Sequence, residues 1–183
     1  KKKNEYDNLR TLGISKSNID YFNKEIVNIE QILWPINKIK IYSEKSPDKE
    51  ILNFNGDNHQ IFSIIKNHDL QKILYDSLKK NKLIRFKNIK NFNNVIKGDY
   101  KLVINCEKNH QITKKFFSNK IEKKYNSYAY ITIINHKRVI NNNTAFQNFT
   151  FNGPIAFLPV SEFQTSVVYS LRSKNLKDNL YIK

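Results

Sequence analysis

Few side chains in this sequence are spaced so that they could carry out chemistry by themselves. The four histidines are His59, His68, His110 and His136. None of them has the spacing to carboxylates or to cysteine that a metal site requires, so we predict that the protein binds no metal. Cys106 and Glu107 lack a histidine or a second thiol at a spacing suited to nucleophilic catalysis, and we therefore assign no catalytic residue.

The positive charge of the chain is a weak indication of a partner. A formal net charge of +16 and a pI near 9.8 are values typical of nucleic-acid-binding proteins. The basic residues are nearly all lysine, however, and they accompany many Asn, Ile, Phe and Tyr residues, all encoded by A- and T-rich codons. Arginine is scarce, and no zinc-finger spacing, aromatic RNA-binding signature or GXXG loop is present. We predict no nucleic-acid partner, although a basic face is compatible with an anionic membrane surface.

Length and composition favour one globular domain in a reducing compartment. The chain has 183 residues, of which 39% are hydrophobic and 13% aromatic, and this is too apolar for a disordered protein. No apolar run is long enough to span a bilayer, and the start of the chain does not resemble a signal peptide. With a single cysteine, no internal disulfide is possible. We expect a cytoplasmic protein, peripheral on the inner membrane face if it meets a membrane.

Apolar spacing predicts two amphipathic helices. Ser17 followed by Asp20 resembles a capping box, and Trp34-Pro35 is expected to end the first helix. Apolar residues recur at steps of three and four between them: Ile19, Phe22, Ile26, Ile29 and Leu33. The second helix is predicted to begin near Asp69, with Asn67 as its cap. A helical turn is expected at residues 112–117, and Ser173 is expected to open a final helix.

Alternation of apolar and polar residues predicts that most of the remaining chain is β-strand. The expected strands are residues 39–42, 51–54, 61–65, 83–86, 92–96, 100–104, 128–134, 144–151, 155–160 and 165–171. Helices and strands segregate along the chain rather than alternating, which predicts an α+β fold with a mainly antiparallel sheet and helices packed on one side. We expect a single domain over 1–183, with 1–35 as a helical entry segment and 36–183 as the sheet with its helices.

The segment "TAFQNFTFNGPIAFLPVSEFQTSVVYSLR", residues 144–172, resembles the central segment of the FAD-dependent aromatic hydroxylases of ubiquinone biosynthesis. That family has Ala and Gln, then Phe-Thr-x-x-Gly-Pro-Leu-Ala-Leu-Leu-Pro-Leu, then a strand that ends in Val-Trp. The matching residues here are Ala145, Gln147, Phe149, Thr150, Gly153, Pro154, Ala156, Leu158 and Pro159. Val168-Tyr169 stands where the family has Val-Trp, and His136 stands about where it has a histidine before the turn.

Weaker similarities follow in the same order upstream. "RTLGIS", residues 10–15, looks like the family's Arg-Thr-x-x-Leu-Ser segment, and "IIKNHDLQKIL", residues 64–74, looks like its strand-to-helix segment. "LVINCEKNHQITKKFF", residues 102–117, stands where the family has Ala-Asp-Gly-x-x-Ser, with Glu107 and Lys108 in place of Asp and Gly. The resemblance implies a fold like the substrate-binding domain of para-hydroxybenzoate-hydroxylase-like flavoprotein monooxygenases.

The resemblance also implies which residues bind substrate and cofactor. It assigns cofactor contacts to Arg10, Asn67 and Glu107. The implied substrate-binding residues are His136, Gln147, Phe149, Gly153, Pro154, Ala156, Leu158 and Pro159. In such an enzyme the inward residues of these strands must be apolar, because water must be kept from the reacting groups and because the substrate carries a prenyl tail.

The activity implied is hydroxylation of a prenylated phenol in ubiquinone biosynthesis. In such enzymes FAD reduced by NAD(P)H reacts with O2 to give a flavin hydroperoxide, and the protein supplies position and excludes water. The Gly-rich dinucleotide fingerprint expected before Arg10 and the Gly-Asp segment expected after Lys183 are absent from this chain. We therefore expect only the substrate-binding part here, inactive on its own.

Two other functions remain open at this stage. The Glu107-Lys108 replacement favours a non-catalytic protein of the same family that binds a lipid or a quinone precursor, because the family's glycine permits close approach to a phosphate. The net charge keeps a nucleic-acid binder as the third hypothesis, which salt-sensitive binding to RNA or DNA would identify. The ring position, the tail length, the nicotinamide cofactor and the oligomeric state are left unassigned.

Overall fold

The described residues divide into two compact units. The computed structural model describes residues 9–56, 59–88, 98, 100–107, 109–117, 121, 123 and 125–172. Unit 1 is drawn from residues 1–81 and 126–183, and unit 2 from residues 82–125. The described fold is α+β with mostly antiparallel sheets and few helices, which confirms the predicted class. That residues 1–183 make up one substrate-binding domain stays a prediction.

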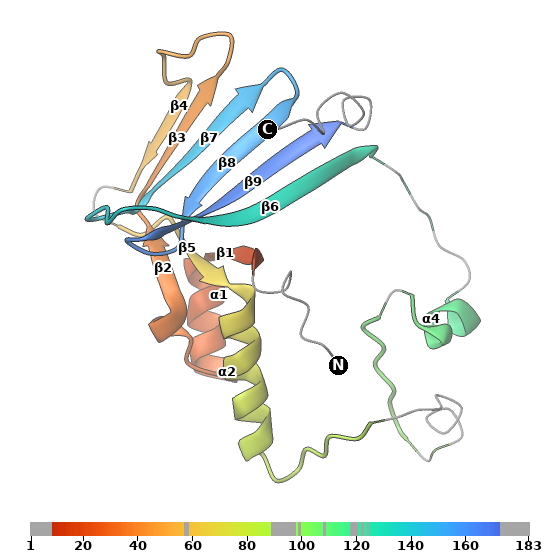
Figure 1. Ribbon diagram of the computed structural model, residues 1–183. Helices are drawn as coiled ribbons and strands as arrows, with labels where there is room; N and C mark the ends of the chain where they lie inside the picture. The colour runs from red at the N-terminus through yellow and green to blue at the C-terminus, as the bar shows by residue number, and fades with distance from the viewer. Residues whose placement is uncertain are drawn as a thin grey trace. The chain divides into compact units, whose positions relative to one another are not determined.

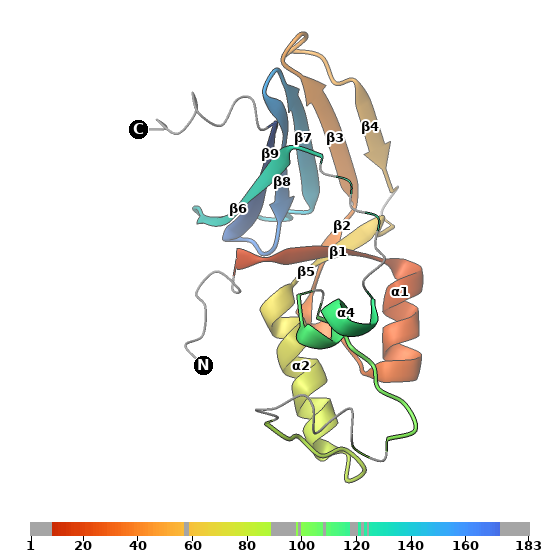
Figure 2. The same cartoon turned by 90° about the vertical axis from the view of Figure 1, so that its right-hand side faces the viewer.

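A small antiparallel sheet in unit 1 holds the first strands of the chain (Figures 1 and 2). Its strands lie in the order β1 (Thr11–Ser15), β5 (Phe62–Lys66) and β2 (Leu33–Ile36). Helix α1 (Lys16–Tyr21) follows β1, and helix α2 (Asn67–Lys80) follows β5. Both helices lie beside this sheet in the two views.

The first predicted helix is shorter than its apolar spacing indicated. Ser15, not Ser17, caps α1, and its side-chain oxygen accepts a hydrogen bond from the backbone N–H of Asn18 at 3.4 Å. The chain then makes a π-helical turn, η2 (Phe22–Ile26), and a 3-10 turn, η3 (Glu30–Ile32). The prediction that Trp34-Pro35 ends a helix was wrong. That pair lies in β2, where an edge strand tolerates a residue without an N–H.

The second helix begins two residues before the predicted start. Asn67 is its first residue, and Lys66 stands at the N-cap without a side-chain hydrogen bond to the helix. The prediction that Asn67 caps this helix was therefore wrong. Leu70, in the first turn of α2, packs against a buried cluster made by Ile14, Ile19 and Ile29.

The larger sheet of unit 1 has six strands, in the order β4-β3-β7-β8-β9-β6 (Figure 1). Their bounds are β3 (Lys38–Ser43), β4 (Leu52–Asn55), β6 (Ser127–Asn135), β7 (Thr144–Thr150), β8 (Gly153–Pro159) and β9 (Gln164–Arg172). Among the described strands β3 and β7 run parallel, and all other neighbours are antiparallel. All six strands were predicted from alternation, with bounds within two residues of those observed.

The two sheets of unit 1 meet at a small buried cluster. Its members are Ile36 of β2, Ile64 of β5, Ala145 of β7 and Val160 after β8. Ile36 is fully buried, and only Asn37 separates it from the start of β3. The Trp34 indole N–H donates to the Asn142 carbonyl at 2.6 Å across the same junction. The chain therefore passes from one sheet to the other at a point held by both packing and a hydrogen bond.

Unit 2 contains one described helix, α4 (Gln111–Phe116), and it confirms the helical turn predicted at 112–117. The strands predicted at 83–86 and 100–104 were wrong, since those residues form no regular element. A short apolar run becomes a strand only where it joins a regular ladder of hydrogen bonds with another strand, and no strand is assigned among the described residues of this unit. The strand predicted at 92–96 and the helix predicted from Ser173 lie outside the described residues.

Replacing Ile36 by alanine should destabilise unit 1 because it leaves a cavity where the two sheets meet. We expect the free energy of unfolding to fall by about 2–5 kcal/mol, measured by urea titration. Ile140 is 70% exposed and is the matched control. The same substitution there should change the value by less than about 0.5 kcal/mol. Equal losses for the two variants would contradict the junction described above.

Candidate functional site

The six-stranded sheet has two faces of different character. Successive side chains of a strand point to opposite faces, so the register assigns every residue to one of them. The inner face carries Ala145 and Leu158, which belong to or pack on the buried cluster at the junction with the small sheet. The outer face carries Phe146 and Phe157, which pair across β7 and β8.

The inner face continues beyond the junction as an apolar surface that is only partly buried. Ala156 lies opposite Gln147 of β7 and Val168 of β9, so these three side chains form one row across the sheet. All three are half-buried although their strands lie in the middle of the sheet. Ile131, opposite Val168 on β6, extends the row and is 37% exposed. The described residues thus leave the centre of this face accessible.

The predicted cofactor-binding residues Arg10 and Asn67 lie together at one corner of unit 1. The backbone N–H of Asn67 donates to the Arg10 carbonyl at 2.9 Å. The neighbouring Thr11 hydroxyl lies 2.9 Å from the hydroxyl of Ser166, a fully buried residue of β9. Since Ser166 is paired with Leu158, this corner adjoins the inner face at a predicted substrate-binding residue.

A hydrogen bond between Lys66 and Gln164 stabilises the same corner. The Lys66 ammonium donates to Gln164 Oε1 at 2.6 Å, which joins the end of β5 to the start of β9. Gln164 Nε2 in turn donates to Asn135 Oδ1 at 2.8 Å, at the end of β6. These hydrogen bonds hold the ends of β5, β9 and β6 together. Because the Arg10 carbonyl is bonded to Asn67, directly after β5, they also fix the position of the Arg10 backbone relative to the large sheet.

Three predicted substrate-binding residues line a hollow at the far end of the sheet. Phe149, Gly153 and Pro154 surround a cavity of about 500 Å³ together with residues of β9. The two residues that turn the chain here are Phe151 and Asn152, because Thr150 pairs directly with Gly153. Gly153 therefore opens β8 rather than forming the turn, and it has φ of +142°, a value that favours glycine.

His136 and Pro159 lie at the opposite end of β8 from Gly153. His136 Nε2 lies 3.0 Å from the Thr165 hydroxyl, and Nδ1 lies 2.7 Å from the Lys137 carbonyl. Both ring nitrogens thus have partners in the protein, so His136 ties the chain after β6 to β9. Pro159 is the last residue of β8, as expected where a residue without N–H ends strand pairing.

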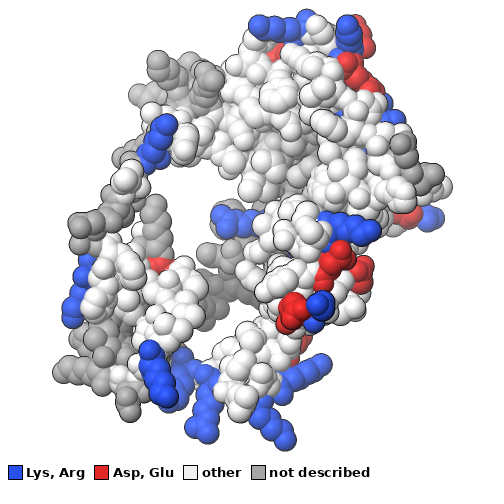
Figure 3. Space-filling view, turned by 180° about the vertical axis from the view of Figure 1, so that it is seen from behind, with Lys and Arg blue, Asp and Glu red and all other residues white. Residues whose placement is uncertain are grey.

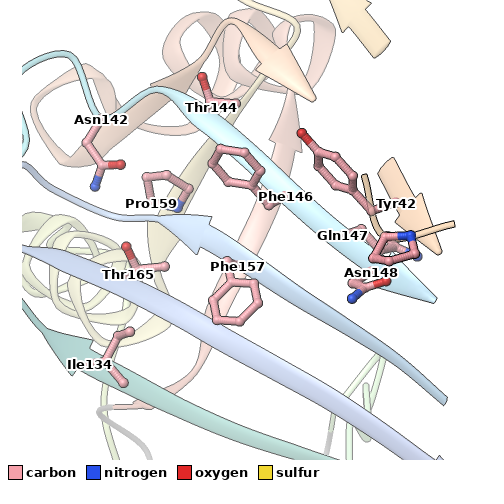
Figure 4. A pocket seen from close by; sticks show the side chains of 11 residues that line it. Tyr42, Ile134, Asn142, Thr144, Phe146, Gln147, Asn148, Phe157, Pro159 and Thr165 are labelled. Atoms are coloured by element: carbon pink, nitrogen blue, oxygen red, sulfur yellow. The ribbon is translucent and has the colours of Figure 1, made fainter. Parts of the chain in front are cut away.

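Sequence reasoning missed a pocket on the outer face (Figure 4). Its volume is about 450 Å³, and two predicted site residues line it: Pro159, which lies on this face, and Gln147, whose side chain the register assigns to the inner face. Tyr42, Phe146 and Phe157 also line it, and they come from three different strands. No sequence pattern connects these aromatic residues. Only the register of β3, β7 and β8 brings them together.

The third predicted cofactor-binding residue, Glu107, belongs to unit 2 and is described within that unit alone. Its carbonyl accepts hydrogen bonds from Thr113 Oγ1 at 2.6 Å and Asn105 Nδ2 at 3.3 Å. Its N–H donates to Asn105 Oδ1 at 3.3 Å. The backbone groups of Glu107 are therefore occupied by its own loop, just before α4.

In Figure 3 much of the upper part of the view is uncharged, while basic and acidic side chains lie along its upper edge and in a mixed group below it. Glu50 accepts hydrogen bonds from Lys40 and from the Tyr42 hydroxyl. The hydrogen bond from Lys40 lowers the pKa of Glu50, and the same bond raises the pKa of Lys40. Arg138 donates to Glu162 at 2.7 Å, which raises the pKa of the guanidinium. These pairs stabilise the hairpin and loops around the sheet and place no charge on its inner face.

Within the described residues, no three His, Cys, Asp or Glu side chains form a group that could hold a metal ion. None of the described helices is both long and apolar enough to cross a membrane. A comparison with models of protein families finds no match, and a comparison with curated proteins finds none that is significantly similar.

Replacing Gly153 by alanine should disturb the β7–β8 hairpin. An added Cβ would lie 1.9 Å from the Ser170 carbonyl oxygen, and φ of +142° is strained for any residue with a side chain. We expect unfolding free energy to fall by at least about 2 kcal/mol. Gly13 is the control, since a Cβ there would meet only ordinary contacts, the nearest at 3.5 Å from Phe62. Gly13→Ala should change stability by less than about 1 kcal/mol. Thermal and urea unfolding of both variants measures these changes, and equal losses for the two variants would contradict the prediction.

Proposed function

We propose that this chain is the substrate-binding part of a FAD-dependent monooxygenase that hydroxylates a prenylated phenol in ubiquinone biosynthesis. The observation that carries the proposal is the inner face of β7, β8 and β9, which the segment resembling these hydroxylases supplies in full. This face is mainly apolar around Ala156, Leu158 and Val168, and it remains partly open in its centre. It is therefore available to a ligand rather than consumed as core.

The physical requirements of the reaction fit that face. A prenyl tail needs an apolar surface, because each buried methylene group stabilises binding by about 0.8 kcal/mol. Ala156 is small and lies between Gln147 and Val168, which leaves room above the middle of the sheet. Gln147 adds one amide among apolar neighbours, a group that can accept or donate a hydrogen bond to the phenol. The row thus combines an apolar body with a single polar contact, as ligand sites usually do.

The corner at Arg10 fits a cofactor that carries phosphate. Arg10 is exposed and belongs to the segment that resembles a cofactor-contacting segment of the hydroxylases. The Thr11–Ser166 contact holds this segment against β9, one strand from Leu158. Cofactor contact and substrate contact would then adjoin at one corner, as transfer between them requires. Arginine suits phosphate because its planar guanidinium donates two parallel hydrogen bonds.

In this proposal the residues of this chain position the substrate and exclude water. FAD, reduced by NAD(P)H, would supply the activation of O2 for transfer of a hydroxyl group to the ring. Arg10 would hold the cofactor, with Asn67 keeping the Arg10 backbone in place through their hydrogen bond. Ala156, Leu158 and Val168 would shield the phenol ring from solvent. Cofactor-binding segments outside this chain would complete the site.

A non-catalytic binder of a lipid or quinone precursor is the second candidate, and Glu107 favours it. Its backbone groups are occupied by Thr113 and Asn105, and Lys108 replaces the glycine that would let a phosphate approach. Both candidates need the inner face to bind a prenylated phenol. Only the monooxygenase needs FAD.

Placing a charge on the inner face should abolish binding of a prenylated phenol such as 2-geranylphenol. We expect Ala156→Lys to weaken binding at least about tenfold, because the ammonium would be buried without a partner. Ile155 is the control: it lies next in β8, has similar burial and points to the outer face. Ile155→Lys should leave affinity within about twofold. Equilibrium dialysis measures both, and equal losses would argue against the inner face as the site.

FAD retention separates the two candidates. Protein expressed from its complete reading frame should copurify with FAD, visible as flavin absorbance, and consume NAD(P)H when O2 and the phenol are supplied. The 183-residue chain alone should retain little FAD, since it supplies few of the contacts. Binding of the phenol together with the absence of flavin from the complete protein would reject the monooxygenase and favour the binder.

A further inference from the structure

One edge of the six-stranded sheet is a long strand with an open side. Strand β6 is the last in the order β4-β3-β7-β8-β9-β6, and among the described strands it pairs with β9 alone (Figures 1 and 2). Eight of its nine residues are exposed. An edge strand presents a row of unpaired backbone N–H and C=O groups, and the partner that satisfies such a row is another strand.

The register shows which backbone groups of β6 face the open side. The pairing with β9 continues past the end of the strand, where the His136 N–H donates to the Phe163 carbonyl at 2.9 Å. In an antiparallel pair, residues that exchange hydrogen bonds alternate with residues that do not. Even-numbered residues of β6 therefore bond to β9. Odd-numbered residues, with Ala129, Ile131 and Ile133 in the middle of the strand, direct their N–H and C=O groups to the open side.

β6 lacks the features that usually protect the edge of a sheet. Natural edge strands are short, or they carry lysine, proline or a bulge. β6 has no charged residue and no proline, although 26% of the chain is charged. It pairs with β9 residue for residue over its whole length, so it contains no bulge. The opposite edge of the sheet, β4, has only four residues, and β6 is therefore the edge that is long enough for a stable pairing.

A second copy of β6 is complementary to the first. In an antiparallel pair centred on Ile131, this residue meets its own copy and all nine residues are paired. Odd-numbered residues then lie opposite odd-numbered residues, so the free N–H and C=O groups of the two strands face each other. On the outer face Tyr128 meets Ile134, and Tyr130 meets Thr132. Pairs of aromatic and β-branched side chains stabilise antiparallel strands, and no charges oppose this contact.

The same pairing covers apolar side chains that the single chain exposes. Tyr128 is 56% exposed, Tyr130 is 46% exposed and Ile134 is 42% exposed. Removing their apolar surface from water adds to the stabilisation by main-chain hydrogen bonds. Because both copies use the same edge, the pairing consumes the one long edge of each chain. Association of this isologous kind closes at two chains.

We propose that the chain forms a symmetric dimer through antiparallel pairing of β6 with β6 of a second copy, with Ile131 on the two-fold axis. The large sheets of the two copies then continue into one another. The proposal does not depend on FAD or on the proposed hydroxylation.

The unmodified 183-residue chain provides the first test. Sedimentation equilibrium should give a mass that rises with concentration from 21.7 kDa to twice that value. Hydrogen exchange should show that the amides of Ala129, Ile131 and Ile133 are protected only where the dimer forms, because the partner strand accepts their hydrogen bonds. The amides of Tyr130 and Thr132 are the internal control. They bond to β9 and should be protected at all concentrations.

Charged variants at the axis test the register. Ile131→Lys places two ammonium groups opposite each other and should weaken dimerisation at least about tenfold. Ile131→Glu should do the same with two carboxylates. An equimolar mixture of these two variants should dimerise at least about fivefold more tightly than either alone, because opposite charges then meet at the axis. Phe54→Lys on β4, where Phe54 is 49% exposed, is the control and should change the dissociation constant less than about twofold.

Several results would overturn the proposal. A chain that stays monomeric at the concentrations used for NMR would mean that β6 does not pair with a copy of itself. Growth beyond two chains would mean open association rather than a closed dimer. Equal losses for Ile131→Lys and Phe54→Lys, or a mixture of the charged variants no tighter than its components, would place the contact elsewhere. Circular dichroism verifies that each variant is folded. If a charged variant does not fold, hydrogen exchange of the unmodified chain still decides.

Discussion

Two β-sheets of unit 1 meet at a small buried cluster, and the positions of both candidate surfaces depend on that contact. Ile36 and Ile64 come from the small sheet, whereas Ala145 comes from the large sheet and Val160 directly follows its strand β8. Asn37 separates β2 from β3, so the chain has little freedom between the sheets, and its N–H donates to the Asn143 carbonyl at 3.0 Å. Because this junction buries one end of the inner face, only the part beyond it remains open. The same packing brings β1, and with it Arg10, next to β9.

The large sheet extends past this junction. There the described residues of other elements cover its faces only in part. Residues 153–158 of the central strand β8 are all half-buried, a burial usually found at the surface of a domain. Domains are built from at least two packed layers, because a sheet with apolar faces must bury them against another element. The sheet therefore offers two surfaces to ligands or to further protein. On the inner face the open area is a row around Ala156, and on the outer face it is a pocket between aromatic rings.

The polar side chains on the two faces of the large sheet differ in their hydrogen bonding. On the inner face the polar contacts gather at the corner where Thr11 meets Ser166 and Lys66 meets Gln164, and they hold strands together. On the outer face Tyr42, Asn142 and Thr165 also bind within the protein, whereas the Asn148 side-chain oxygen makes no hydrogen bond to a described residue. A satisfied hydrogen bond stabilises the fold modestly, whereas an unsatisfied buried acceptor destabilises it by more than that.

The sequence by itself determined the strands, because alternation of apolar and polar residues has the period of a pleated strand. It correctly predicted all six strands of the large sheet, and it failed at residues 83–86 and 100–104, where the structure assigns no regular element. It also overextended the first helix, since spacing cannot distinguish a long helix from α1 followed by tighter and wider turns. Only the tertiary structure decided which residues share a site. Thr11 and Ser166 are 155 residues apart in sequence, and Tyr42, Phe146 and Phe157 belong to three strands. Such neighbours arise from strand order and register, which depend on long-range packing and leave no local pattern to read.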